Sequence, residues 1–171
     1  MKEIPLTQGL VAIVDNDDYE RVSAHRWYTA ISRTSSDGVS LIYAVRSAYR
    51  PDGQRRQQRL HRFILDAPDN MQVDHINGDG LDNRRENLRL CTSAENSRNV
   101  RPYTGGTSAL KGVSWHLRVK KWRAQIKING KKLHLGYYST EEDAAKAYDS
   151  AALRFHGEFA RTNFKEVQHV Q

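Results

Sequence analysis

Short apolar runs in the front part of the chain predict strands. The runs Leu10–Val14 and Leu41–Arg46 each have strand character, and the second follows a Ser-Ser-Asp-Gly turn at 35–38. The segment Gln57–Leu65 instead carries apolar residues at helical spacing. These patterns predict an α+β arrangement for residues 1–66.

The next segment alternates short ordered runs with turn residues. Met71–Ile76 predicts a strand that ends at Asn77-Gly78, a dipeptide typical of tight turns. Glu86–Leu90 predicts a returning strand, and Thr92–Glu95 has the spacing of a capping box that starts a helix. The predicted order is therefore strand, long polar loop, strand and helix.

The C-terminal part shows the clearest alternation, over residues 111–135, with a hairpin turn at Asn129-Gly130. Thr140–Asp143 predicts the start of a helix, and Gly157 is suited to follow its end. One side of the predicted sheet is apolar: Trp122, Ala124, Ile126, Ile128, Leu133 and Leu135. The helix carries a matching apolar stripe: Ala144, Ala147, Tyr148, Ala151, Ala152 and Phe155.

The length of 171 residues allows one ordinary domain or two small ones. Proline and two glycines make 100–108 a predicted linker. We therefore expect a domain at 1–99 with its motif core at 71–99, a second domain at 109–165, and a tail at 166–171. The fold class expected for the whole chain is α+β, ending in a three-stranded antiparallel sheet packed on one helix.

Composition excludes several classes of protein. The longest aliphatic run, Leu10–Val14, is far shorter than the ~20 residues that span a bilayer, and no basic and apolar leader begins the chain. Cys91 is the only cysteine, which excludes an internal disulfide and a thiolate zinc cluster. We expect a reducing, cytoplasmic setting and no membrane partner.

The net charge of +7 is concentrated in the C-terminal part. Residues 101–171 carry 13 basic and 6 acidic side chains, whereas the first hundred residues balance. Between Glu95 and Glu141 there are ten basic residues and no acid, with tryptophans and tyrosines among and beside them. This pattern predicts a polyanion partner, and nucleic acid above all, because the segment predicts strands rather than a membrane-binding basic helix.

Asp74, His75 and Asn96 suit metal-assisted cleavage of a phosphodiester. Carboxylate and amide oxygens are hard ligands that fit Mg²⁺ or Mn²⁺, and a neutral histidine can accept a proton from water. A calcium loop starting at Asp74 fails because its third position is Ile76. Neighbours on a strand point to opposite faces, so Asp74 and His75 converge only if the backbone twists near Asn77-Gly78.

The run Val73–Asp79, followed by Asp82-Asn83-Arg84, Glu86–Arg89 and Asn96, resembles the HNH endonuclease family, closest to its phage and intron-encoded homing branch. The resemblance covers about residues 58–99. It implies that His75 is the general base and that Asp74 and Asn96 hold one divalent metal. It also implies a bacterial or phage-infected cell as the setting.

The same resemblance assigns supporting roles around these residues. Asn87 is the middle residue of the motif, and its amide is expected to bond to the loop backbone and hold His75 in place. The third position of the name-giving pattern is Asn96 here rather than histidine, which makes zinc less favoured. His61 is a further candidate for contact with phosphate or loop. Four arginines are candidates to clamp DNA phosphates: Arg84, Arg85, Arg89 and Arg98.

Residues 107–164 resemble the plant ethylene-response-factor (apetala-two type) DNA-binding domain. The residues that carry the resemblance include Lys111-Gly112-Val113, Trp122–Ile126, Leu135–Tyr138 and Ala147-Tyr148-Asp149. The resemblance implies that the polar sheet face enters a DNA groove. The residues expected to face DNA are Ser114, His116, Arg118, Arg123, Gln125, Lys127, Lys132 and His134. Several of them differ from the plant pattern, so the plant target sequence does not transfer.

Together these patterns predict a site-specific DNA endonuclease of the homing type that acts on double-stranded DNA with one Mg²⁺ or Mn²⁺. One active site per chain predicts nicking by a monomer or weak dimer. The alternatives are a non-catalytic, sequence-specific DNA-binding regulator and, less favoured, a module that binds structured RNA. The sequence leaves open the target and cut position, nicking against double-strand cleavage, the oligomeric state, the metal, and an intron-borne, free-standing or restriction-like role.

Overall fold

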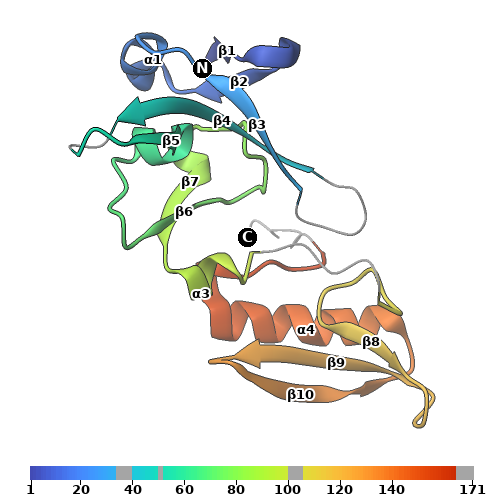
Figure 1. Ribbon diagram of the computed structural model, residues 1–171. Coiled ribbons are helices and arrows are strands. Elements are labelled where there is room, and N and C mark those ends of the chain that lie inside the picture. Colours follow the sequence, from blue (N-terminus) through green and yellow to red (C-terminus); the bar gives the residue numbers. More distant parts are fainter. Residues whose placement is uncertain (34–39, 50–51, 100–105, 165–171) are drawn as a thin grey trace, which may run out of the picture. The chain divides into compact units, whose positions relative to one another are not determined.

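The chain forms two compact units, residues 1–96 and 97–171, in the computed structural model (Figure 1). The structure describes residues 1–33, 40–49, 52–99 and 106–164. The predicted turn at 35–38, most of the predicted linker and all of the predicted tail lie outside these residues. Within the described part of the chain, no helix is long and apolar enough to cross a membrane.

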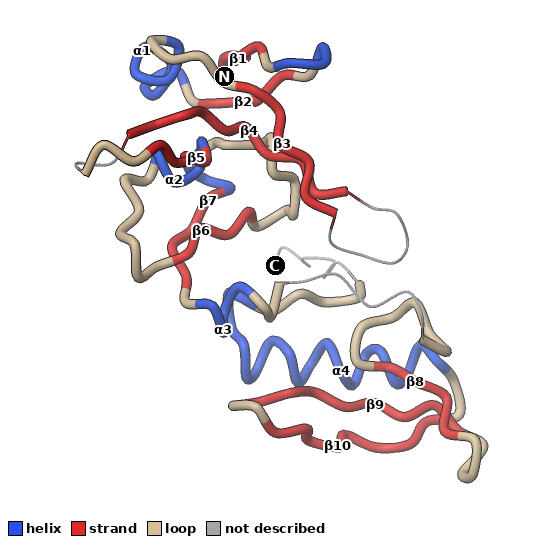
Figure 2. The backbone as a smooth tube through the Cα atoms, in the orientation of Figure 1, coloured by secondary structure: helices blue, strands red, loops and turns tan. Residues whose placement is uncertain are grey.

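The first unit is built from short antiparallel sheets and short helices, as the tube view makes plain (Figure 2). Its three sheets are β1-β2, β3-β4-β5 and β6-β7. In chain order its elements are β1 (Lys2–Pro5), η1 (Thr7–Gly9), β2 (Val11–Val14), α1 (Asn16–Ser23), β3 (Tyr28–Arg33), β4 (Ser40–Tyr49), β5 (Arg55–Arg59), α2 (Leu60–Ile64), β6 (Gln72–His75), η2 (Arg85–Asn87), β7 (Leu88–Cys91) and α3 (Ser93–Asn96).

One apolar core joins these elements. Val14 of β2, Val22 of α1 and both Leu60 and Ile64 of α2 are fully buried in it. The helix predicted over Gln57–Leu65 begins only at Leu60, because the preceding residues pair with β4 as strand β5. Pairing with a neighbouring strand thus overrides the local helical pattern in that segment.

The polar loop between β6 and β7 docks onto the front of the chain through its backbone. Ile13 of β2 donates to the Leu81 carbonyl and accepts from the Asn83 N–H, both at 2.8 Å. Gly80 lies so close to β4 that an added Cβ would be 2.2 Å from the Ile42 carbonyl oxygen. Only glycine permits this approach, which fixes the loop beside β4.

Two local predictions in this region have different outcomes. The returning strand predicted over Glu86–Leu90 begins at Leu88, because Arg85–Asn87 form the 3₁₀ turn η2. The capping box is confirmed: the Thr92 N–H donates to Glu95 Oε2 at 2.8 Å, and the Glu95 N–H donates to Thr92 Oγ1 at 3.3 Å.

The second unit is a three-stranded antiparallel sheet covered on one face by a helix (Figure 1). Asn129 and Gly130 both have positive φ, as the tight β9–β10 turn requires. The predicted fold class, α+β with this sheet-on-helix unit, is confirmed. The elements are β8 (Val113–His116), β9 (Lys121–Ile128), β10 (Lys131–Tyr138), α4 (Glu141–His156) and η3 (Gly157–Phe159), in the sheet order β10-β9-β8.

Small side chains let α4 lie close to the sheet. Ala124 of β9 and Ala144 and Ala145 of α4 are fully buried against one another. The predicted helix start is confirmed, since Thr140 Oγ1 accepts from the Asp143 N–H at 3.1 Å. Gly112 backs onto the Tyr148 ring so closely that no Cβ fits.

Two residues that were predicted to lie on the buried apolar surfaces are exposed. Phe155 is 41% exposed, and His156 takes the buried position at the end of α4. Leu133 pairs with Ile126 but is 43% exposed, because β10 is an edge strand and a bulge follows between His134 and Gly136.

Candidate functional site

The hairpin β6–β7 carries the two central candidates, Asp74 and His75, in a regular ladder. Asp74 pairs with Arg89 and His75 pairs with Leu88, and both candidates are buried, at 7% and 5% exposure. Neighbours in a regular ladder project to opposite faces. The hairpin therefore presents its carboxylate on one face and its imidazole on the other, at the end of β6.

His75 lies among other rings. The His61 ring stands edge-on to it, with centroids 4.8 Å apart, and the Tyr43 ring is 6.0 Å away. Burial lowers the pKa of His75 despite the acids around it, and burial lowers the pKa of His61 to about 2. Both imidazoles are consequently neutral at neutral pH, which is the state that can accept a proton.

Asn83 fixes the orientation of the His75 ring. Its side chain is 1% exposed, and its Nδ2 donates to the Gly80 carbonyl at 3.4 Å. Its Oδ1 faces His75 Nε2 at 3.5 Å, at the long end of hydrogen-bonding distance. Because an amide oxygen only accepts, this contact favours a proton on Nε2 and leaves the acceptor lone pair of the ring on Nδ1.

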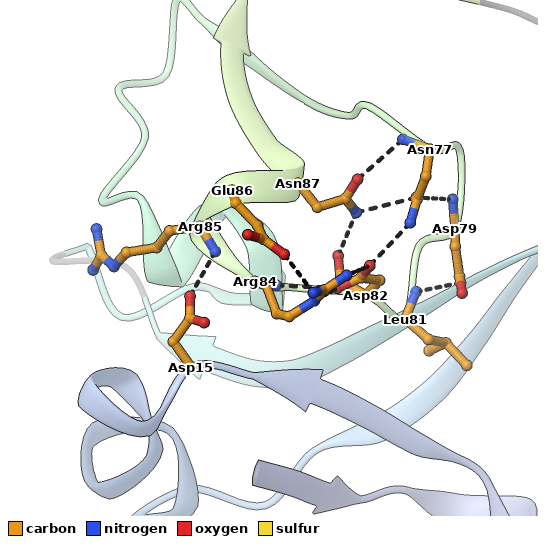
Figure 3. A network of polar contacts seen from close by, with 9 residues as sticks. All are labelled: Asp15, Asn77, Asp79, Leu81, Asp82, Arg84, Arg85, Glu86 and Asn87. Atoms are coloured by element: carbon orange, nitrogen blue, oxygen red, sulfur yellow. Dashed lines mark hydrogen bonds and ion pairs between the residues drawn. The ribbon is translucent and has the colours of Figure 1, made fainter. Parts of the chain in front are cut away.

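Asn87 ties the two ends of the polar loop together (Figure 3). Its Oδ1 accepts from the Asn77 N–H at 3.0 Å, and its Nδ2 donates to the Asp82 carbonyl at 2.8 Å. Both partners lie in the segment that follows His75. The buried amide of Asn87 thus holds the loop against the start of β7, next to His75.

Arg84 and Arg85 each bind a carboxylate within the unit, as Figure 3 shows for Arg84. Arg84 donates to Asp82 at 2.8 Å through Nε and Nη2, and this contact holds the pKa of Asp82 below its usual range. Arg85 donates to Asp18 at 2.7 and 2.8 Å. Both arginines therefore stabilise the loop, and any contact with DNA phosphate stays a prediction.

The remaining candidates of this unit lie on the Asp74 side. Arg89 forms an ion pair with Asp74 at 2.7 Å in which both side chains are nearly buried. Asn96, at the end of α3, donates from Nδ2 to Gln72 Oε1 at 2.6 Å, and Gln72 shares a strand face with Asp74. The structure therefore gathers Asp74, Asn96 and Arg89 on one face of the hairpin.

The candidate DNA-contacting residues of the second unit lie mainly on the sheet face opposite α4. Registers place Ser114 beside Arg123, Gln125 beside His134, and Lys127 beside Lys132. Arg118 is exposed in the β8–β9 turn. Arg98 precedes the sheet, and its carbonyl accepts from the Lys111 ammonium.

Comparison with known proteins identifies both parts of the chain. The family model described as HNH endonuclease matches residues 66–98. An uncharacterized HNH endonuclease, L560, of Acanthamoeba polyphaga mimivirus is 30% identical over 162 residues, which cover 91% of this chain and 76% of that protein. The chain belongs to the HNH endonuclease family.

Other similarities divide along the chain. Protein 3.8 of Escherichia phage T7 is 35% identical over 94 residues, which are 55% of this HNH chain and 77% of the phage protein. The AP2 domain model matches residues 108–158. The AP2-like ethylene-responsive transcription factor PLT2 of Arabidopsis thaliana is 46% identical over 65 residues, 37% of this chain but 11% of that factor. The AP2 domain supports DNA binding by the second unit.

HNH endonucleases generally use a divalent metal. The side chains on the Asp74 face carry donor atoms of the type that bind such an ion. A carboxylate and an amide oxygen are hard donors. The Arg89 guanidinium already lies against Asp74, so a cation there shares the carboxylate with Arg89 or takes its place. Among the described residues, no group of three or more His, Cys, Asp or Glu could hold a metal.

Sequence reasoning missed several residues of these sites. Asn83 and Tyr43 both approach His75, but only the tertiary fold brings Tyr43 there. Lys121 stands beside His116, and Tyr137 stands beside Arg123 and within 5.1 Å of the His116 ring. The alternation of β9 could have identified Lys121, because it continues the series Arg123, Gln125 and Lys127.

Proposed function

We propose that the chain is a site-specific DNA endonuclease of the homing type, in which the first unit hydrolyses one phosphodiester and the second unit positions it on duplex DNA. One observation carries the proposal: a buried, neutral His75 follows the carboxylate of Asp74 at the end of β6, with Asn96 on the same face as Asp74. The proton acceptor and the hard metal donors thus occupy consecutive positions at one strand end, on opposite faces of the hairpin, and in this proposal the scissile phosphate reaches both around the end of β6.

In this proposal His75 is the general base. The neutral imidazole accepts a proton from the attacking water, while Asn83 contacts Nε2 and the His61 and Tyr43 rings pack beside the imidazole. Asn87 keeps the following loop closed around the histidine. General-base catalysis of this kind contributes about 10²–10⁴ in rate.

Asp74 and Asn96 are the proposed ligands of one Mg²⁺ or Mn²⁺. When bound, the ion supplies positive charge that offsets the charge of the scissile phosphate and of the departing oxygen. Arg89 neutralises the carboxylate beside the same site. Its guanidinium donates to Asp74 Oδ2 at 3.0 and 2.7 Å, which holds the carboxylate in place within the hairpin.

The sheet of the second unit is the proposed reader of duplex DNA. Its outer face carries lysines, an arginine and hydrogen-bonding side chains in register, and a polar strand ribbon of this size fits a major groove. With one active site per chain, a monomer nicks one strand in a single event, whereas a dimer brings two active sites. Double-strand cleavage then requires two events.

Supercoiled plasmid carrying the target is the substrate that tests the proposal. Wild-type protein with Mg²⁺ or Mn²⁺ should convert it to the nicked circle, and EDTA should abolish the conversion. Asp74→Ala serves as the matched variant and should lose metal-dependent nicking. Failure of the wild type to nick in any common divalent ion sinks the enzymatic proposal.

The second candidate is a non-catalytic DNA-binding regulator. The Arg89–Asp74 ion pair favours it, because a guanidinium can satisfy the carboxylate in place of a metal. The same assay separates the two candidates, since a regulator binds duplex DNA without nicking it in any divalent ion.

A further inference from the structure

A shallow cavity lies on the three-stranded sheet of the first unit, apart from the residues assigned above. It is lined by Tyr28 of β3, Ser47 of β4, and three consecutive residues of β5, Arg55, Arg56 and Gln57. Every lining side chain carries a hydrogen-bond donor, and none is acidic. The cavity therefore suits an anion.

The strand register connects this cavity with the candidate active site. Arg55, Gln57 and Arg59 alternate along β5, so they share one face of the sheet, and all three are exposed. The Arg59 guanidinium lies 4.7 Å above the centre of the Tyr43 ring, and that ring is the neighbour of His75. A basic row about 13 Å long thus runs along β5 beside the histidine.

Hydrogen bonds within the chain hold some of the side-chain donors of the cavity in place. Arg55 donates to Ser47 Oγ through Nε at 3.1 Å and Nη2 at 2.7 Å, which directs its guanidinium across the strand. Arg56 alternates with Arg55 and Gln57 and so points to the other face of the sheet, where, among the described residues, its buried Nε has no hydrogen-bond partner. The nearest acid to Arg56 is Asp69, at 3.8 Å and 93% exposed, which is a weak partner.

Among the described residues, neither Arg55 nor Arg59 forms an ion pair, and both are exposed, so an anion from outside the chain is the natural complement of this row. Arginine forks match the oxygens of a phosphate, and hydroxyl and amide groups such as those of Tyr28, Ser47 and Gln57 are ordinary phosphate donors. We propose that this cavity and the Arg55–Arg59 row bind phosphates of the DNA backbone next to the cut site. This rests on the proposed function, in which DNA is the substrate.

The proposal gives the first unit a DNA contact of its own, separate from the sheet of the second unit. Its test uses the full chain with a 30-base-pair duplex in EDTA, so binding is measured without cleavage. Fluorescence anisotropy over a salt series gives the slope of log affinity against log salt, which changes by about 0.9 per phosphate contact.

The variants are Arg55→Gln, Arg59→Gln and their double, with Arg154→Gln as the matched control. Arg154 is an exposed arginine of α4, the helix that covers the face of the second unit's sheet opposite the candidate DNA-contacting residues. The double should make the slope less negative by about 1 to 2, and the control should leave it unchanged. Arg55→Gln alone keeps the test open if the double does not fold, since the edge strand already has glutamine at 57 and 58.

Equal slopes for the double and the Arg154→Gln control would overturn the proposal. Tighter binding of an RNA hairpin than of the duplex, with the same loss in the double, assigns the cavity to RNA and also overturns it. Absence of any duplex binding by the wild type defeats it together with the proposed function. Duplex binding without nicking in Mg²⁺ or Mn²⁺ defeats the proposed catalysis alone.

Discussion

Basic side chains have different surroundings next to the HNH motif and on the sheet of the second unit. Next to the motif, Arg84, Arg85 and Arg89 each lie against an aspartate of the same unit. On the outer face of the sheet, Lys127 stands directly opposite Lys132, in a stretch of sequence without acids. A cluster of bases near an active site is therefore not in itself a DNA-binding surface.

Charged side chains stabilise the fold of the first unit and form a basic surface on the second. In the first hundred residues acids and bases are equal in number, and several of them pair within the first unit. In the second unit a like-charge pair opposite each other is unfavourable for the sheet itself. Such a pair is retained at a cost in stability, which an anionic partner would offset on binding.

The largest expected effect concerns the ion pair beneath the HNH site. Arg89→Ala leaves the nearly buried Asp74 carboxylate without its guanidinium, and loss of one partner of a buried pair costs about 3–5 kcal/mol. Urea unfolding followed by far-UV circular dichroism measures the loss. The matched variant Lys146→Ala, from the exposed Glu142–Lys146 pair of α4, should leave the unfolding curve unchanged. Equal effects for both variants would contradict the contrast.

A smaller effect is expected from acid, and it belongs to the first unit. The pKa of His61 is about 2 in the fold and ~6.5 unfolded, so below pH 6.5 only the unfolded chain takes up the proton. Stability is therefore full above pH 6.5 and falls by up to about 1.4 kcal/mol per pH unit below it.

The His61→Phe variant tests this pH dependence, because it keeps a ring beside His75 but cannot titrate. Thermal unfolding between pH 7 and 5 should show a shallower decline for this variant than for the wild type. Parallel declines for the two proteins would mean that His61 protonates in the folded state.

The smallest expected effect is a gain in stability together with weaker DNA binding. Lys127→Gln removes the repulsion with Lys132 and should raise the free energy of unfolding by ~0.2–1 kcal/mol. It should also weaken duplex binding and reduce the salt slope by about 0.9. Denaturant unfolding and anisotropy on the same preparation measure both. A loss of stability together with unchanged binding would show that this face does not contact DNA.

Local patterns were sufficient to predict many elements of the fold. The capping boxes at Thr92 and Thr140, the Asn129-Gly130 turn and the sheet-on-helix unit all follow from short-range rules. The start of α2 was wrong because β5 owes its conformation to pairing with β4, a contact distant in sequence. The prediction that Phe155 belongs to the buried stripe was wrong, because helical spacing predicts a face of the helix but not where the partner sheet ends.

The candidate site shows the same limit. Sequence reasoning singled out Asp74, His75 and Asn96 by residue type and placement, and Asn87 through the family resemblance, and all four roles stay predictions. It could not show that Asp74 is held by Arg89 or that Tyr43 reaches His75, because these contacts depend on strand register and loop docking. The AP2 face was more accessible to sequence reasoning, since alternation along β9 and β10 fixes which side chains share a face.

The central claim is that the first unit cuts and the second unit reads, and one paired measurement tests it. Duplex binding in EDTA and single-turnover nicking in Mg²⁺ are measured for the wild type, His75→Ala and the Lys127→Gln/Lys132→Gln double. His75→Ala should bind as the wild type does and nick about 10²–10⁴ times more slowly. The lysine double should bind less tightly yet nick at the wild-type rate once saturated. Loss of binding and nicking together in His75→Ala would contradict the account.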